Sequence, residues 1–159
     1  MTKSFTFALI CSLLLGFISS SKGQPISNLQ RTRIEQQVDS VFHNNLKAAE
    51  HFDYDQLSQS VDDKYKAGFI WNNIFYARYD SLINIVKTRS QGVSKQTMTI
   101  QKEKITVISE QIVLLTAIGV TNVELNNGTT ISANFFWSFV YEKTGKNWKV
   151  IQSHQSSVR

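Results

Sequence analysis

Hydrophobic positions in the first half of the chain recur every three or four residues, which is the spacing of an amphipathic helix. Residues 27–49 keep this spacing over about six turns, with charged and amide side chains between the apolar ones. The pattern predicts a long helix with Ser27 as its N-cap. The same spacing predicts a short helix over about 53–63 and a third helix over about 77–89. The buried stripe of the first helix is predicted to be Leu29, Ile34, Val38, Val41, Phe42, Leu46 and Ala49.

After Gly92 the period changes to two, as in strands that bury one face. The alternating stretches are residues 97–107, 111–125, 129–142 and 147–156. Short turns join them, and Asn127-Gly128 is the pair most typical of a tight hairpin. An aromatic and β-branched stretch at 65–72 predicts one further short strand, with a turn at Asn72 and Asn73.

This order of elements, with helices first and hairpin-linked strands last, is typical of the α+β class. We expect a strongly curved antiparallel sheet that carries the helices on one face. No repeat or linker-like composition divides the chain after residue 23, and about 136 residues are enough for one domain with its own core. Residues 24–159 are therefore predicted to form one domain.

The last predicted strand carries the most informative pattern. Uninterrupted alternation puts Trp148, Val150, Gln152, His154 and Ser156 on one side of it. A titratable imidazole would then share a face with core side chains and point into a pocket with a polar end. His154, with a usual pKa of about 6.5, would be suited to move a proton near neutral pH. The alternative is a core histidine whose nitrogens bond to Ser156 or to a helix side chain.

The first 23 residues have the pattern of a secretory signal peptide. Lys3 precedes an apolar run from Phe5 to Ile18, and small residues follow as far as Gly23. The run is shorter than the roughly 20 apolar residues of a membrane-spanning helix. We therefore expect cleavage near Gly23, export to the periplasm or the extracellular space, and no stable membrane insertion afterwards. The only cysteine, Cys11, lies in this segment, so the exported domain would contain no disulfide.

The charge of the chain does not indicate nucleic acid as a partner. The sequence contains 17 basic and 12 acidic residues. Lys3 and Lys22 would leave with the signal segment, so 15 basic residues would remain against 12 acidic ones. The remaining lysines and arginines are interrupted by acidic or apolar residues and form no basic stripe.

The sequence indicates neither a metal site nor a hydrolase nucleophile. His43 and His51 lie eight residues apart on the first predicted helix, which separates them by about 12 Å, too far to share one ion. No Gly-x-Ser-x-Gly turn is present for a nucleophilic serine. We therefore expect no metal and no organic cofactor.

Several stretches together resemble the nuclear transport factor 2-like superfamily. They are residues 52–57 with 61–63, the strand at 135–142, and residues 148–150 with His154 and Ser156. The chain is most similar to the SnoaL-like, ketosteroid-isomerase-like branch, over about residues 27–156. The resemblance implies a cone-shaped α+β fold with a pocket between the curved sheet and the helices, and frequent dimers through the sheet. Members of this branch isomerise, cyclise or dehydrate small molecules, or act as binding domains.

In isomerase-like members, an acidic residue in the cavity moves a proton. The strand at 129–142 offers no Asp or Glu before Glu142, and Phe135 and Trp137 stand where many relatives carry a polar or cationic side chain. The cavity is therefore expected to be aromatic and apolar. Aromatic residues at such spacing also serve simply as packing. The other residues predicted to contact a ligand are Trp71, Tyr54, Tyr76, Gln152 and Ser156.

Two classes of function remain open. The favoured one is an exported binding or accessory domain that holds a small apolar molecule or a peptide segment without catalysis. The alternative is a small-molecule isomerase, cyclase or dehydratase in which His154 is the general acid and base, while Ser156, Gln152 or a tyrosine positions the substrate. The outer face of the sheet, with Ile112 and Leu114, is apolar enough to predict a homodimer.

Overall fold

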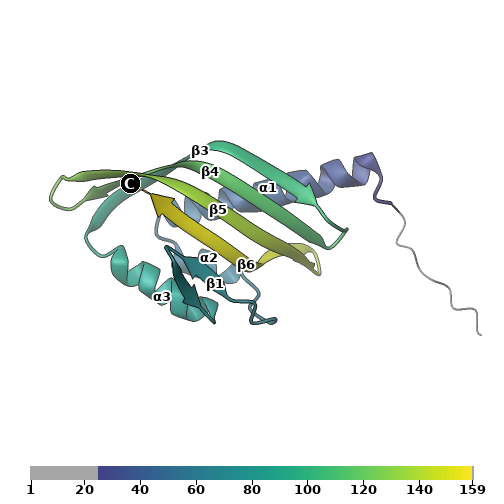
Figure 1. Ribbon diagram of the computed structural model, residues 1–159, viewed down its shortest axis with the longest axis horizontal. Coiled ribbons are helices and arrows are strands. Elements are labelled where there is room, and N and C mark those ends of the chain that lie inside the picture. The colour runs from purple at the N-terminus through teal and green to yellow at the C-terminus, as the bar shows by residue number, and fades with distance from the viewer. Residues whose placement is uncertain (1–24, 159) are drawn as a thin grey trace, which may run out of the picture.

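The computed structural model describes residues 25–158, which form three helices and one six-stranded sheet (Figure 1). The helices are α1 (Asn28–Glu50), α2 (Tyr54–Gln59) and α3 (Tyr79–Arg89). The strands are β1 (Phe69–Trp71), β2 (Ile74–Tyr76), β3 (Val93–Val107), β4 (Ile112–Leu125), β5 (Thr130–Thr144) and β6 (Asn147–Val158). The predicted signal peptide, residues 1–23, lies outside the described residues. Within residues 25–158, no helix has both the length and the hydropathy required to cross a bilayer.

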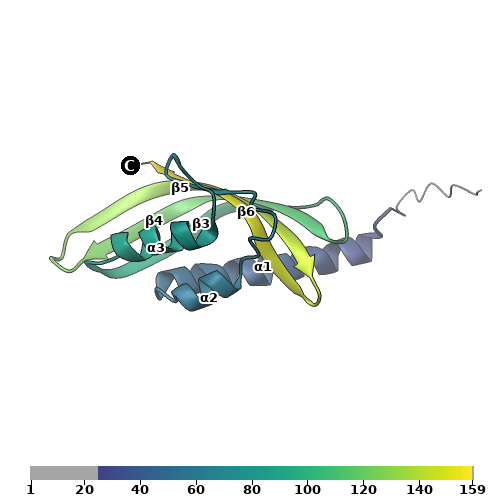
Figure 2. The same ribbon diagram turned by 90° about the horizontal axis from the view of Figure 1, so that it is seen from below.

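The sheet is a four-stranded meander extended at one edge by a small hairpin. Its strand order is β2-β1-β6-β5-β4-β3. The pairings from β3 to β6 are antiparallel, whereas β1 lies parallel to β6, with Phe69 opposite Ser153. Figure 2 shows the helices together on the concave side of the curved sheet. The predicted α+β class, with helices covering one face, is confirmed. The sequence prediction ended the first strand at the Asn72-Asn73 turn and missed β2, which follows it.

Helix α1 forms where the sequence predicts it and buries a narrower stripe. The Ser27 hydroxyl accepts a hydrogen bond from the backbone N–H of Gln30 at 3.2 Å, which caps the first turn. Leu29 was predicted to be buried, but it lies at the start of the helix and is 84% exposed. The buried stripe begins one turn later, at Ile34, and the first turn contacts the sheet through Arg31, whose guanidinium donates to the Val107 carbonyl oxygen at 3.1 Å. The buried residues are Ile34, Val38, Phe42, Leu46 and Ala48.

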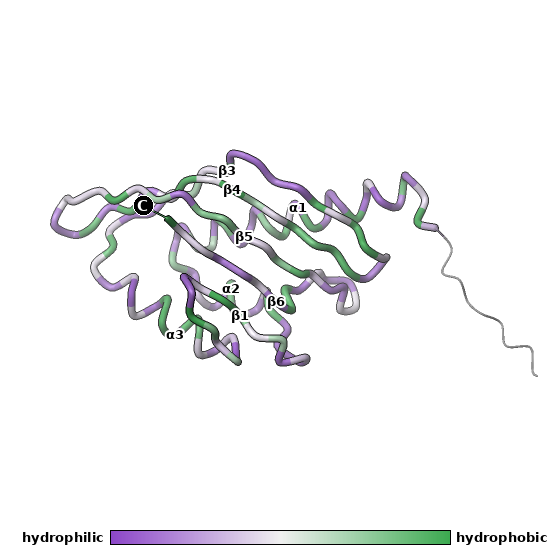
Figure 3. Tube along the Cα trace, in the orientation of Figure 1, coloured by the Kyte–Doolittle hydropathy of each residue, from purple (hydrophilic) through white to green (hydrophobic). Residues whose placement is uncertain are grey.

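The core lies between the concave face of the sheet and the helices. β4 is the most hydrophobic of the four long strands, and β3 at the edge is largely hydrophilic (Figure 3). Alternation along β4 buries Val113, Leu115 and Ala117 against the helices, and β5 buries Phe135 and Tyr141. The opposite, outer face of β4 carries Ile112, Leu114 and Ile118, as the sequence predicts. A homodimer through this face stays a prediction.

Three register shifts interrupt the strand pairing, one at the start of β3 between Val93 and Lys95 and one within each of β3 and β6. The latter two decide which side chains face the helices along most of their strands. In β6, Gln152 pairs with Val140 and Val150 pairs with the next residue, Tyr141, so Ile151 is an extra residue. In β3, Ile100 pairs with Gly119 and Lys102 with Ile118, so Gln101 is extra. Each extra residue exchanges the inner and outer faces for the rest of its strand.

Candidate functional site

A large pocket opens between the concave face of the sheet and the three helices. Its volume is about 560 Å³, within the range of about 300–1,000 Å³ that is usual for small-molecule sites. α1 contributes Phe42 and Leu46, and α3 contributes Leu82 and Val86. The sheet provides the facing wall, mainly from β5, with further residues from β3, β4 and β6. The lining is therefore apolar on both sides.

An aromatic row along β5 forms the central part of the sheet wall. Four alternate residues, Phe135, Trp137, Phe139 and Tyr141, face the pocket because they share one side of the strand. The Phe135 and Trp137 rings are stacked with centroids 4.1 Å apart, and the Trp137 and Phe139 rings meet edge to face at 6.0 Å. From α1, the Phe42 ring packs against the Phe139 ring, with their centroids 5.8 Å apart. These contacts hold the rings in fixed orientations along the wall of the pocket.

A second group of aromatic residues lies where β1, α2 and α3 meet. The Arg89 guanidinium lies 5.0 Å from the centre of the Trp71 ring, and the Lys87 ammonium lies 5.9 Å from the centre of the Tyr54 ring. The Tyr54 hydroxyl is hydrogen-bonded to Ser90 at the end of α3. Trp71, Tyr54 and Arg89 all line the pocket. This end of the pocket is therefore both aromatic and positively charged.

Comparison with known proteins identifies the family to which this fold and pocket belong. A sequence profile described as the SnoaL-like domain matches residues 38–159. The chain belongs to the SnoaL-like family. A search of curated proteins finds no match to the SnoaL-like chain.

Solved structures support the same fold for this SnoaL-like domain. A nuclear transport factor 2-like protein from Salmonella enterica is 16% identical with a TM-score of 0.72, and the match covers 81% of this chain and 94% of that one. A hexachlorocyclohexane dehydrochlorinase, LinA type 2, is 12% identical with a TM-score of 0.70, and the match covers 84% of this chain and 90% of that one. A candidate scytalone dehydratase from Novosphingobium aromaticivorans is 7% identical with a TM-score of 0.72, covering 84% and 89%. At these identities the likeness shows the fold alone.

Four of the residues that the sequence singles out line the pocket of the SnoaL-like domain. Phe135 and Trp137 stand on the sheet wall, and Trp71 and Tyr54 stand at the charged end. Their contact with a ligand stays a prediction. Tyr76 is partly buried against the core and lies outside the pocket lining, because β2 is the outermost strand of the sheet.

His154 does not share a face with Trp148, so the predicted alternation along β6 is wrong. The extra residue Ile151 exchanges the two faces, so Trp148 and Val150 face the core while Gln152, His154 and Ser156 face outward. His154 is exposed and pairs with Ser138. The Ser156 hydroxyl donates to the Phe136 carbonyl oxygen at 3.1 Å rather than to His154. His154 and Ser156 border a shallow depression on the outer face of the sheet.

Residues that sequence reasoning missed take the inner positions of β6. Ser153, Gln155 and Ser157 line the pocket after the bulge, and Asn72 lies beside them. The Gln155 side chain donates to the Ser153 hydroxyl at 3.1 Å, and the Asn72 carboxamide oxygen accepts from the Ser157 hydroxyl at 2.9 Å. Alternation alone predicts that Ser153, Gln155 and Ser157 lie on the outer face of the sheet. Their inner position could be predicted only if the position of the bulge were known.

Two tyrosines on the pocket wall are held as neutral hydroxyls. Burial raises the pKa of Tyr79 well above its usual value. Burial also raises the pKa of Tyr141, and the nearby Glu103 carboxylate adds to the rise, while a hydrogen bond with Asn45 opposes it. Both phenols therefore remain protonated at neutral pH and are suited to hydrogen bonding rather than to accepting a proton.

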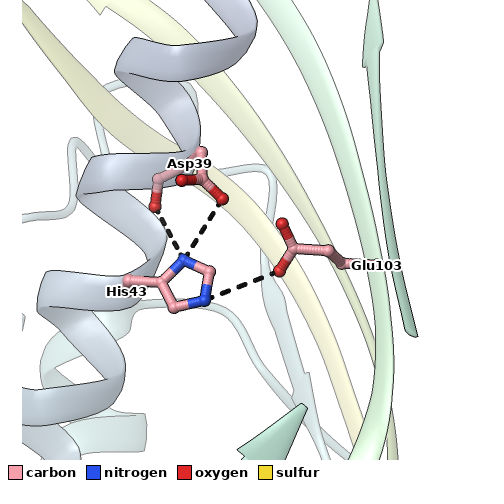
Figure 4. A group of neighbouring side chains, drawn as sticks. All are labelled: Asp39, His43 and Glu103. Carbon is pink, nitrogen blue, oxygen red and sulfur yellow. Dashed lines mark hydrogen bonds and ion pairs between the residues drawn. The ribbon is translucent and has the colours of Figure 1, made fainter. Parts of the chain in front are cut away.

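A cluster of three titratable side chains lies between α1 and β3, outside the pocket lining (Figure 4). The ligand-type atoms of Asp39, His43 and Glu103 lie within 4.8 Å of one another. His43 Nδ1 donates to the Asp39 carbonyl oxygen at 3.1 Å and lies 3.2 Å from the Asp39 carboxylate. His43 Nε2 faces Glu103 at 3.9 Å.

This cluster is better suited to sharing a proton than to holding a metal ion. The Nδ1 atom of His43 is already hydrogen-bonded to Asp39. Only His43 Nε2 and the Glu103 carboxylate are therefore left to bind a common ion. Zinc sites use three or four protein ligands. The sequence predicts that Asp39 and His43 are neighbours, because they are four residues apart on a helix. It does not predict their contact with Glu103, because Glu103 belongs to β3 and meets them only in the folded structure.

Glu103 gives a testable pH dependence. Burial raises the pKa of the Glu103 carboxyl; the neighbouring Asp39 carboxyl adds to the rise, and His43 opposes it. A carboxyl with a raised pKa favours folding when protonated, and this contribution is lost as the pH rises through the pKa in the folded protein. Glu103→Gln is neutral at every pH, so we expect it to be more stable than wild type at pH 7 by less than about 1 kcal/mol.

Thermal unfolding from pH 4 to pH 8 measures this difference. The gain should vanish near pH 4, where Glu103 is protonated in wild type. Glu110→Gln is the matched control, because Glu110 is exposed in the turn before β4. A Glu103→Gln variant that is less stable than wild type at pH 7 would show that the attraction to His43 outweighs burial.

Proposed function

We propose that this SnoaL-like domain is an exported binding or accessory protein that holds a small, largely apolar molecule in the pocket without converting it. The observation that carries the proposal is the composition of the lining. Among the described residues that line the pocket there is no Asp, Glu, His or Lys. The titratable side chains among them are Tyr54, Tyr79, Tyr141 and Arg89. The remainder is aromatic, aliphatic, or a hydroxyl or amide.

The competing function is isomerisation, cyclisation or dehydration of a small molecule. Two of the structurally similar proteins carry the names of a dehydrochlorinase and of a candidate dehydratase. General acid–base catalysis requires a group within hydrogen-bond reach of the substrate and with a pKa near the working pH. His154 faces away from the pocket, and the raised pKa of Tyr141 makes it a poor proton acceptor. The lining therefore supports binding more than turnover.

Isothermal titration calorimetry with 1-decanol tests whether the pocket takes an apolar molecule. Burial of each CH2 group is worth about 0.8 kcal/mol, so a Kd between about 1 and 100 µM is expected for the wild-type protein after the costs of association. Ala133→Trp places an indole in the pocket from β5 and should weaken binding at least about tenfold. Ser132→Trp is the matched control, since Ser132 is the preceding residue of β5 and is exposed.

The alternatives make different predictions in the same experiment. Equal binding by the wild-type and Ala133→Trp proteins would place the ligand elsewhere and contradict the proposal. His154→Ala should bind 1-decanol like wild type, because His154 is on the outer face. A loss of binding in that variant would instead restore His154 to the site.

A further inference from the structure

Arg89 is the one charged side chain among the described residues that line the pocket. It lies in the last turn of α3, where the helix dipole favours a basic residue. The dipole accounts for a positive charge at this position but not for the direction of the side chain. The guanidinium extends over the Trp71 ring, at 5.0 Å from its centre, and so borders the pocket.

The positive charge at this end of the pocket has no carboxylate partner within the described part of the chain. Of the ion pairs in residues 25–158, none includes Arg89 or Lys87. By contrast, Arg78, the residue just before α3, forms an ion pair with Asp80 at 3.2 Å. Lys87 lies over the Tyr54 ring on the same side of the pocket. Arg89 therefore lines one end of an otherwise uncharged cavity, and Lys87 lies beside it over the Tyr54 ring, outside the lining.

Asn72 adds a donor beside Trp71. Its carboxamide oxygen accepts hydrogen bonds from the backbone N–H and the hydroxyl of Ser157, at 3.0 and 2.9 Å. This arrangement fixes the amide orientation, so the side-chain nitrogen is the group that remains to donate. Asn72 lines the pocket together with Arg89. The charged end therefore offers hydrogen-bond donors suited to an anionic acceptor.

We propose that the natural ligand is an amphipathic carboxylic acid, whose carboxylate is bound by Arg89 and whose apolar body lies against Phe135, Trp137 and Phe139. This inference rests on the proposed binding function and names the chemical class of the ligand. The planar guanidinium can meet a carboxylate with two parallel hydrogen bonds, and stacking on Trp71 restricts its orientation in advance. The aromatic row supplies the apolar surface at the other end of the molecule.

A matched pair of probes, decanoate and 1-decanol, tests the inference because the two differ only in the head group. Calorimetry at low ionic strength should show decanoate binding to the wild-type protein at least about tenfold more tightly than 1-decanol. Arg89→Gln should remove this preference and leave 1-decanol binding within about twofold of wild type. Arg89→Lys keeps the charge but loses the fork, so it should retain only part of the preference.

Arg78→Gln is the control, since it removes the same charge at the opposite end of α3 and should leave both affinities unchanged. Arg89 is exposed, so its variants should fold like wild type, and thermal unfolding verifies this. Equal affinity of the wild-type protein for the two probes, or an unchanged decanoate affinity in Arg89→Gln, would overturn the acid preference alone. Failure of both probes to bind would overturn the proposed function as well.

Discussion

Replacing Gly119 with alanine is expected to lower the free energy of unfolding by about 3 kcal/mol, because the inner face of β4 has no room for a methyl group there. A Cβ atom at this position would stand far inside contact distance of the Thr99 carbonyl oxygen and of the Phe135 ring, whose Cε1 atom would be 2.9 Å away. A side chain can rotate away from such a contact. The Thr99 carbonyl cannot, since it belongs to the backbone of the neighbouring strand β3.

Urea unfolding of Gly119→Ala against wild type measures the effect. Thr116→Ala is the control, because Thr116 is on the outer face of the same strand and is exposed, so its loss should stay below about 1 kcal/mol. A Gly119→Ala protein as stable as wild type would mean that β3 and β4 can separate at this point without cost, which would contradict the close approach of the strands.

The second large effect is expected at Phe69, the first residue of β1. Its side chain is 0% exposed and meets the Tyr79 ring of α3 edge to face at 5.2 Å. Phe69→Ala would leave a cavity between β1 and α3 and should cost about 4 kcal/mol. The same change should also loosen α3, and with it the wall of the pocket that carries Arg89.

Phe75→Ala is the matched control, since Phe75 belongs to the partner strand of the same hairpin and is 64% exposed. Its loss should be below about 1 kcal/mol. Chemical unfolding gives both values, and hydrogen exchange in α3 reports the local loosening. Similar losses for the two variants would indicate that the hairpin is not anchored by Phe69.

Local pattern was sufficient to predict most of the elements. The three- and four-residue spacing from Ser27 onward predicts α1 because a single stripe must face the sheet, and alternation predicts the four long strands because each buries one side. The Asn127-Gly128 turn joins β4 and β5 as expected, with Gly128 at a φ of 80°. These signals are contained in neighbouring residues, so they can be read without knowledge of the fold.

The side of β6 that faces the pocket could not be predicted in the same way. The alternation from Trp148 to Ser156 has no visible interruption, yet Ile151 is an extra residue. At the bulge, the backbone N–H of Val150 donates to the Ser60 carbonyl oxygen, and the Val150 carbonyl accepts from Asp62, both at 2.9 Å. Ser60 and Asp62 are about 90 residues from Val150 along the chain, so the residue pattern within β6 does not predict the bulge. The inner positions of Ser153, Gln155 and Ser157 follow from that distant contact.

The parallel pairing of β1 with β6 also favours one order of assembly during folding. Asn72 is bonded to Ser157, which follows it by 85 residues, so the pairing of β1 with β6 closes a long loop of the chain. Closing so long a loop is entropically unfavourable and slow compared with forming the local hairpins. The local hairpins of the meander can therefore form first, and the end of the cavity that carries Trp71 is completed last.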